Sequence, residues 1–195
     1  MRESEIKRKT NETEITLSVS LDGTGRNAID TSIGFFNHML TLFSVHSMVD
    51  LSVKCIGDID VDFHHSVEDV GIVLGEAVKE ALGDKEGIRR YGFFLLPMDE
   101  ALVQIAIDLS GRSTLSFNCP FPTEKIGSFD TELVEEFFSA YVRSAGITLH
   151  IDLIRGCNSH HIAEAIFKCF AHAFRDAVEI DERNCGTIPS SKGVL

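Results

Sequence analysis

The sequence HHIAE at residues 160–164 repeats the pattern of HHSVE at residues 64–68. Both read His-His-x-x-Glu, and both run directly into a segment with apolar residues at helical spacing. On a helix, the Glu lies four residues after the first His and three after the second, and both spacings share a helix face. The adjacent histidines point about 100° apart, because a helix has about 3.6 residues per turn. Each stretch can therefore supply His and Glu to one metal ion or present its histidines to two, unless it is only the polar first turn of a surface helix.

Predicted strands and helices follow in the same order around the two stretches. In the first half, apolar periodicity predicts strands at 13–21, 27–32 and 50–56 and helices at 35–45 and 68–82. In the second half, it predicts strands at 100–109, 113–118 and 147–154 and helices at 131–144 and 160–178.

The two halves also agree in spacing. His38 lies 13 residues before Leu51, and Glu136 lies 13 residues before Leu149, so Glu136 takes the place of His38 in the second half. We therefore predict an α+β fold with an internal duplication of a β-β-α-β-α unit. It would form two four-stranded sheets with helices on one face, from a first half at 1–90 and a second half at 91–195. Two such halves can bring their His-His-x-x-Glu ends together, or those ends can meet the ends of another subunit.

Composition limits the classes of protein to which the chain can belong. It has 195 residues, 44% of them hydrophobic, and a net charge of −12. This length suits one compact unit or two small halves that share a core. The acidity disfavours nucleic acid and anionic membrane surfaces as partners.

The cysteines and the start of the chain indicate a compartment. The five cysteines are odd in number and include no C-x-x-C pair, so we expect reduced thiols. The charged start, MRESEIKRKTNETEI, lacks the apolar segment of a signal peptide, and no apolar run approaches the length of a membrane span. We expect a cytoplasmic protein.

Histidine and glutamate provide enough candidate ligands for two metal sites of four. The candidates are His38, His64, His65, Glu68, Glu136, His160, His161 and Glu164. Imidazole with some carboxylate suits Mn, Fe, Co, Ni or Zn rather than Ca or Mg. His150, in a predicted strand, is a reserve ligand, and we expect His172 to be structural.

The C-terminal segment departs from the repeat. Residues 186–195 are rich in Gly and Ser and place Lys192 directly after Ser190 and Ser191. The segment is either a frayed tail or a flexible anion-binding segment, because hydroxyls, backbone amides and a Lys all suit phosphate.

Several long motifs occur in an order that resembles one enzyme family. The motifs are GFFNHML (34–40), FHHSVEDVGI (63–72), RRYG (89–92), PMDEAL (97–102), DLSGR (108–112), LHIDLIRGCNSHHIAEAIFK (149–168) and PSSKGVL (189–195). Across essentially the whole chain, they resemble the imidazoleglycerol-phosphate dehydratase family of histidine biosynthesis. The resemblance implies S5-domain-2-like repeats and a homo-oligomer of 24 subunits built from trimers. It also implies two Mn²⁺ per active site, with these sites at subunit interfaces.

The resemblance also implies roles for individual residues. Seven of the eight candidate ligands match family ligand positions, and Glu136 stands where some members have His. Glu12, His65 and Glu164 are implied to be catalytic. The implied substrate contacts are Glu12, His38, His46, His64, His65, Glu68, Arg90, Arg112, Ser190, Ser191 and Lys192. The two Arg and the Lys would form the local basic patch that an acidic chain needs for a phosphomonoester.

The implied reaction removes water from D-erythro-imidazoleglycerol phosphate and gives imidazole-acetol phosphate. The carbon that loses its proton has no adjacent carbonyl, so the imidazole must act as the electron sink. Two metals on its two nitrogens would hold it as imidazolate, and loss of hydroxide would give a diazafulvene. Glu12 is the expected acid/base.

Two other classes of protein fit parts of this pattern. A dinuclear metallohydrolase acting on a small phosphorylated substrate also gathers His and Glu around two metals, but it would release inorganic phosphate. A metal-storage or metal-sensing protein is the non-enzyme alternative. A storage bundle would need four long helices, and the strand-rich repeat argues against it. A sensor would normally need a nucleic-acid-binding element, which the acidity of the chain disfavours.

Overall fold

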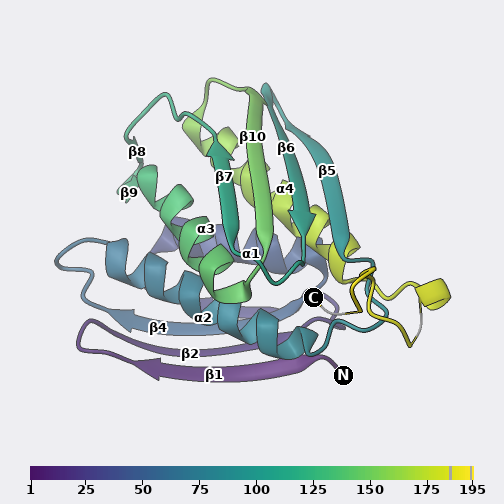
Figure 1. The fold of residues 1–195 in the computed structure, drawn as a ribbon. Coiled ribbons are helices and arrows are strands. Elements are labelled where there is room, and N and C mark those ends of the chain that lie inside the picture. The colour runs from purple at the N-terminus through teal and green to yellow at the C-terminus, as the bar shows by residue number, and fades with distance from the viewer. Residues whose placement is uncertain (185, 194) are drawn as a thin grey trace.

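A computed structural model describes residues 1–184, 186–193 and 195, which form two four-stranded sheets packed with two shorter helices and two longer ones (Figure 1). The first half contains β1 (Glu3–Lys9), β2 (Thr13–Ser20), β3 (Asn27–Asp30), α1 (Gly34–Ser47), β4 (Asp50–Gly57) and α2 (His64–Leu82). The second half contains β5 (Tyr91–Met98), β6 (Ala101–Asp108), β7 (Thr114–Asn118), α3 (Glu132–Ala145), β10 (Thr148–Arg155) and α4 (Ser159–Val178). A small hairpin of β8 (Lys125–Ile126) and β9 (Phe129–Asp130) precedes α3, and a short 3-10 turn (Glu182–Asn184) follows α4.

The two sheets have the same topology. Their strand orders are β1-β2-β4-β3 and β5-β6-β10-β7. In each sheet three strands pair antiparallel, and the last pair, β3 with β4 or β7 with β10, is parallel. The α+β class, the duplication and the two four-stranded sheets are thus confirmed.

Each repeat has one strand more than the predicted β-β-α-β-α unit. The additional strands are β1 and β5, and each is the edge strand next to the first predicted strand of its half. In β1 the side facing away from the helices carries charged residues such as Glu5 and Lys7, and the other side includes Ser4 and Arg8. Charges on an edge strand prevent pairing with other chains, but they also remove the apolar alternation from which a strand is predicted.

The helices pack across the two halves. Gly71 and Gly75 lie one turn apart on α2, where a Cβ atom would come within 2.8 Å of the Phe137 carbonyl oxygen and 2.6 Å of the Tyr141 carbonyl oxygen. Glycine at these two places therefore lets α3 of the second half approach the backbone of α2 closely. On the other side, Phe43 of α1 packs against Phe170 of α4, with ring centroids 5.4 Å apart.

One continuous apolar core joins the sheets and the helices of both halves. Buried aromatic rings from α1, α3 and α4, including Phe36, Phe137 and Phe167, lie at its centre. Among the described residues, no helix has both the length and the apolar content that a bilayer-spanning segment requires. The described cysteines, Cys55, Cys119, Cys157 and Cys169, are free thiols, and Cys185 lies outside the described residues.

Candidate active site

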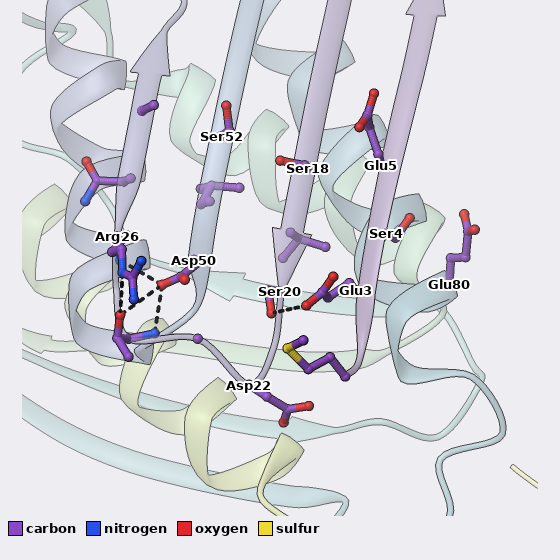
Figure 2. A pocket seen from close by; sticks show the side chains of 17 residues that line it. Glu3, Ser4, Glu5, Ser18, Ser20, Asp22, Arg26, Asp50, Ser52 and Glu80 are labelled. Carbon is purple, nitrogen blue, oxygen red and sulfur yellow. Dashed lines mark hydrogen bonds between the residues drawn. The ribbon is translucent and has the colours of Figure 1, made fainter.

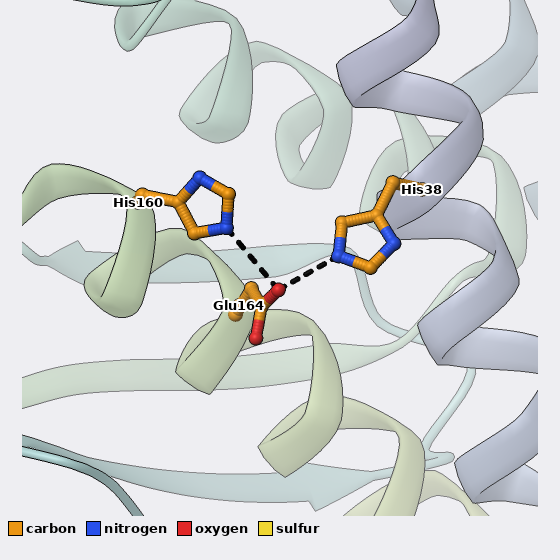
Figure 3. A group of neighbouring side chains, drawn as sticks. All are labelled: His38, His160 and Glu164. Carbon is orange, nitrogen blue, oxygen red and sulfur yellow. Dashed lines mark hydrogen bonds and ion pairs between the residues drawn. The ribbon is translucent and has the colours of Figure 1, made fainter.

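The first candidate metal group joins α1 to the start of α4. Asn158 caps α4, and its side-chain oxygen accepts hydrogen bonds from the amides of His160 and His161. Because α4 therefore begins at Ser159, His160 and Glu164 share one face. The Nε2 atoms of His38 and His160 lie 2.7 Å and 3.2 Å from the same oxygen of Glu164 (Figure 3).

Glu164 is a buried carboxylate held in its ionised form. Burial opposes ionisation, but hydrogen bonds from Lys168 and His38 outweigh it and lower the pKa of Glu164 to about 2. Lys168 Nζ lies 2.6 Å from the carboxylate oxygen that does not face the two histidines. The other oxygen and both imidazoles thus converge on a point that a cation can occupy.

The second candidate group joins α3 to the start of α2. One ligand atom from each of His64, Glu68 and Glu136 lies within 4.8 Å of the others. Arg143 lies beside the two carboxylates, with Nη2 3.0 Å from Glu68 and 3.7 Å from Glu136. This group therefore has one imidazole and two carboxylates, whereas the first has two imidazoles and one carboxylate.

The two groups are related by the internal repeat. His38 is the fifth residue of α1, and Glu136 is the fifth residue of α3. Each combines with the His and Glu of the long helix from the opposite half. The equivalence of His38 and Glu136 predicted from spacing is thus seen in the structure, and both groups depend on the packing of one half against the other.

The second histidine of each motif belongs to neither group. His65 Nδ1–H donates to Asp58 Oδ2 at 2.9 Å, and His161 Nδ1–H donates to Glu100 Oε2 at 2.7 Å. The hydrogen bond to the carboxylate raises the pKa of each histidine, and His161 lowers the pKa of Glu100 to about 2. A carboxylate on one ring nitrogen fixes the tautomer and makes the other nitrogen a better metal ligand.

Glu12 occupies the turn immediately before β2, close to His65. Its carboxylate lies 3.9 Å from His65 Nε2, and its side chain is half exposed. Its backbone carbonyl accepts a hydrogen bond from the amide of Asp58, the residue that holds the other side of the His65 ring. Glu12 and His65 are thus linked directly, by the contact between their side chains, and indirectly, by the hydrogen bonds that each makes with Asp58.

The predicted phosphate-binding residues gather in a separate pocket. Arg90, Arg112, Ser190, Ser191 and Lys192 line a hollow of about 480 Å³. The tail is folded onto it, because Arg90 Nη1 donates to the Pro189 carbonyl at 2.8 Å. Arg90 is in turn held by Asp108, whose carboxylate lies 2.7 Å from Nε. The described part of the tail therefore lies against basic residues, and its role in anion binding stays a prediction.

The three remaining histidines, His46, His150 and His172, lie outside both metal groups. His46 and His172 lie with ring centroids 5.3 Å apart, and burial lowers the pKa of both. His172 also stacks on Phe94 at 4.4 Å, which agrees with its predicted structural role. The reserve ligand His150 is exposed on β10 and lies in neither metal group.

A larger hollow lies elsewhere, on the face of the first sheet that points away from the helices. It measures about 860 Å³ and contains carboxylates and hydroxyls, including Glu3, Glu5, Ser18 and Asp50 (Figure 2). Its carboxylates would repel a phosphomonoester, and no histidine lines it. The chemistry of the chain therefore points to the His/Glu groups and the basic pocket instead.

The donor atoms of both groups suit a first-row divalent metal. Each group brings together three nitrogen or oxygen donors, and an octahedral ion would keep open positions for substrate and for further ligands. The supporting residues Asp58, Glu100, Asn158 and Lys168 were not among the predicted site residues. Of these, Lys168 could have been found, because it lies four residues after Glu164 on a predicted helix.

Comparisons with known proteins agree with this geometry. The family model described as imidazoleglycerol-phosphate dehydratase matches residues 31–174. Two proteins named imidazoleglycerol-phosphate dehydratase, from Cereibacter sphaeroides and Roseobacter denitrificans, are each 60% identical over 195 residues, and the alignments cover both chains completely.

Solved structures of the same enzyme share the fold. The crystal structure of imidazoleglycerol-phosphate dehydratase from Staphylococcus aureus is 46% identical, with a TM-score of 0.84 over 92% of this chain and 99% of that one. The enzyme from Pyrococcus furiosus is 33% identical, with a TM-score of 0.84 over 97% of this chain and 100% of that one. The chain therefore belongs to the imidazoleglycerol-phosphate dehydratase family, whose members are hydro-lyases of histidine biosynthesis.

Proposed function

We propose that this chain removes water from D-erythro-imidazoleglycerol phosphate with the help of two Mn²⁺ per active site, in the cytoplasm. The observation that carries the proposal is the pair of His/Glu groups, each built from both halves of the chain. The basic pocket of Arg90, Arg112 and Lys192 supports the same substrate, because it can hold a phosphomonoester.

The metals supply the electron-withdrawing part of the chemistry. When bound, two Mn²⁺ would withdraw charge from the two ring nitrogens of the substrate, so that imidazolate and then diazafulvene become accessible. We assign the metals to the groups around Glu164 and Glu68, with His65 and His161 as further ligands. Because Glu164 has a pKa of about 2, it stays a carboxylate over the whole working range of pH.

Glu12 is the group that transfers protons. Its carboxylate would remove the proton from the second carbon of the glycerol chain, and the hydroxyl next to the ring leaves with a proton as water. The resulting enol tautomerises to the ketone of imidazole-acetol phosphate. The exposed side chain of Glu12, close to His65, supports this role because the carboxylate can reach a substrate outside the fold.

Within one chain, the basic pocket lies far from the metal group around Glu164. His160 lies at the start of α4, whereas the Arg90 amide of the basic pocket bonds to the Ala177 carbonyl near its end. Seventeen residues of helix separate His160 from Ala177, which corresponds to about 26 Å. A substrate with a three-carbon chain cannot bridge that distance. We therefore propose active sites at subunit interfaces, in a homo-oligomer of 24 chains built from trimers.

Turnover of imidazoleglycerol phosphate tests the activity and its metal dependence. Protein of defined size is assayed before chelation, after chelation and after Mn²⁺ is added back, and both the ketone product and inorganic phosphate are measured. Formation of ketone phosphate that is lost with chelator and restored by Mn²⁺ supports the proposal. Release of inorganic phosphate would instead indicate the dinuclear metallohydrolase.

The role of Glu12 has its own test. Glu12→Gln keeps the shape of the side chain but removes its basicity, so we expect turnover to fall by about 100-fold or more while bound metal stays constant. Turnover like that of the unmodified protein would exclude Glu12 as the acid/base.

Complementation tests the shared site. Arg112→Ala disables the basic pocket and His160→Ala disables a metal group, so each variant alone should be inactive. When the two are co-expressed, a site that takes its pocket and its metals from different chains is intact in about a quarter of random pairings. Recovery of activity supports a shared site, and complete absence of recovery in mixed oligomers would place each site within one chain.

A further inference from the structure

The first repeat contains a buried polar triad at the turn that carries Glu12. Asp69 lies on α2 and is only 7% exposed. One of its carboxylate oxygens lies 2.7 Å from Arg8 Nη1 on β1, and the other accepts a hydrogen bond from the hydroxyl of Thr13, the first residue of β2. The triad therefore ties both strands beside the turn to the helix that carries His64, His65 and Glu68.

The equivalent places in the second repeat are apolar. Arg8 pairs with Ile15 across the first two strands, as Leu96 pairs with Val103 in the second sheet. Thr13 begins β2 as Ala101 begins β6, and Asp69 follows the Glu of its motif as Ala165 does. The second-repeat residues are Leu96, Ala101 and Ala165, all of them buried.

This difference shows that the fold does not need the polar triad. The second repeat forms the same strands, turn and helix with three apolar side chains in the same places. A buried ion pair also carries a desolvation cost, and replacing one by well-packed apolar residues is often neutral or stabilising. The triad therefore requires an explanation other than stability.

The two turns differ in the glutamate that they carry. Glu12 precedes β2 and Glu100 precedes β6, so the two residues are equivalent. Glu100 is held in place, because its carboxylate accepts hydrogen bonds from His161 and from the amides of Cys157 and Asn158. The carboxylate of Glu12 has one ion-pair contact among the described residues, with His65 Nε2 at 3.9 Å.

The backbone on both sides of Glu12 depends on the same anchor. The Thr10 hydroxyl accepts hydrogen bonds from the amides of Glu12 and Thr13, at 3.1 Å and 3.0 Å. The hydroxyls of Thr10 and Thr13 are also within hydrogen-bond distance, at 3.3 Å. Since Asp69 fixes the hydroxyl of Thr13, it fixes the turn from which the Glu12 side chain projects.

We propose that Arg8, Asp69 and Thr13 are positioning residues that aim the Glu12 carboxylate at the substrate. The inference rests on the proposed acid/base role of Glu12. A carboxylate on an unanchored turn would lose the alignment that proton transfer needs. The triad holds the turn from behind and so maintains this alignment without using the carboxylate itself.

The test is to install the second repeat's residues in the first. The variant Arg8→Leu/Thr13→Ala/Asp69→Ala should keep its Tm and its bound metal. We expect kcat to fall by about 100-fold with little change in KM, because a small displacement of a catalytic group costs that much. The matched control is Asp22→Asn, which breaks the ion pair of Asp22 with Arg2 at the other end of β1 and should leave kcat unchanged.

A double-mutant cycle separates positioning from general damage. If the triad acts through Glu12, adding Glu12→Gln to the triple variant should lower kcat no further than Glu12→Gln alone. Multiplicative losses would overturn the proposal, as would a triple variant with full activity. If the triple variant does not fold, Thr13→Val serves instead, because it keeps the shape of Thr13 and removes only the hydroxyl that donates to Asp69. A Glu12→Gln variant with full activity would remove the proposed function of Glu12 itself. A Glu12→Gln variant with reduced but measurable activity, whose loss multiplies with that of the triple variant, would remove this inference alone.

Discussion

His38 Nε2 lies 2.7 Å from Glu164 Oε1, although the two residues belong to different halves and are 126 positions apart in the chain. The contact exists because α1 of the first half packs on α4 of the second. In the other group, Glu136 meets His64 and Glu68 because α3 packs on α2. The affinity for metal should therefore depend on how the two halves pack against each other, and not only on the presence of the ligands.

The first prediction concerns His38→Ala. Loss of this imidazole leaves His160 and Glu164 as the only members of their group, so we expect roughly half of the bound metal to be lost. Elemental analysis of protein of defined size, after dialysis against Mn²⁺, measures the change. The control is His150→Ala, which should keep the full metal content. Full retention of metal in His38→Ala would exclude this group as a metal site.

The second prediction concerns Glu136→His. The change gives the second group two imidazoles and one carboxylate, as in the first group, and softer donors favour Zn²⁺ and Ni²⁺ over Mn²⁺. We expect the ratio of Zn²⁺ to Mn²⁺ affinity to rise about tenfold in calorimetric titrations of metal-free protein. Glu76→His, an exposed position further along α2, is the control. An unchanged ratio would show that Glu136 is not a ligand.

The third prediction concerns Gly75→Ala. The new Cβ would lie 2.6 Å from the Tyr141 carbonyl oxygen and 2.8 Å from the Ser144 Cβ, so α3 must move away from α2. We expect a loss of about 1–3 kcal/mol in the free energy of unfolding. We also expect weaker metal binding at Glu136, which moves with α3. Denaturant titration and metal analysis measure the two effects.

Gly34→Ala is the control for this change. No atom lies within 4 Å of the added Cβ, and the position begins α1, so the variant should be stabilised by up to about 1 kcal/mol. If Gly75→Ala were as stable as Gly34→Ala, the close approach of α2 and α3 would not be required.

The fourth prediction concerns pH and Glu100→Gln. Glu100 raises the pKa of His161 above 6.5, so the pair stabilises the metal-free fold fully below that pH, and this contribution is lost as pH rises through the folded pKa of His161. The difference in Tm between the unmodified protein and Glu100→Gln should therefore be larger at about pH 5.5 than at about pH 9. Hydrogen bonds from the amides of Cys157 and Asn158 to Glu100 do not titrate in this range.

The measurement is made with chelator present, so that no metal competes for His161. Histidine-selective NMR should also show a lower pKa for His161 in the variant than in the unmodified protein. A Tm difference that grows with rising pH would contradict the assigned hydrogen bond.

Much of the fold could be predicted from the sequence because the two halves agree in the order and spacing of their elements, so that each supports the prediction for the other. Spacing alone identified Glu136 as the residue equivalent to His38 in the second half. Apolar alternation predicted the ends of β2, β4, β6 and β10 to within about two residues. The edge strand β1 was missed because Ile6 is the only apolar residue on its inward side, between Ser4 and Arg8. The start of α2 was placed four residues late, at Glu68 instead of His64.

The grouping of the ligands could not be predicted in the same way. Which helix covers which depends on tertiary packing, such as the glycines Gly71 and Gly75 that admit α3, and no local pattern specifies this packing. Helix geometry predicts that His64 and His65 point in different directions, but it does not specify the partners that each one meets. The division of the chain at residues 90 and 91 stays a prediction, as do the roles of the individual residues.

The packing of α1 on α4 and of α3 on α2, each across the two halves, has a consequence for the origin of the chain. One His/Glu group takes one residue from α1 and two from α4, and the other takes one residue from α3 and two from α2, so that each group combines both halves. A half-length polypeptide that paired with an identical copy about a two-fold axis would make both groups at once. Joining the copies in tandem frees their matching positions to diverge, and His38 with Glu136, or Asp69 with Ala165, are places where they have done so.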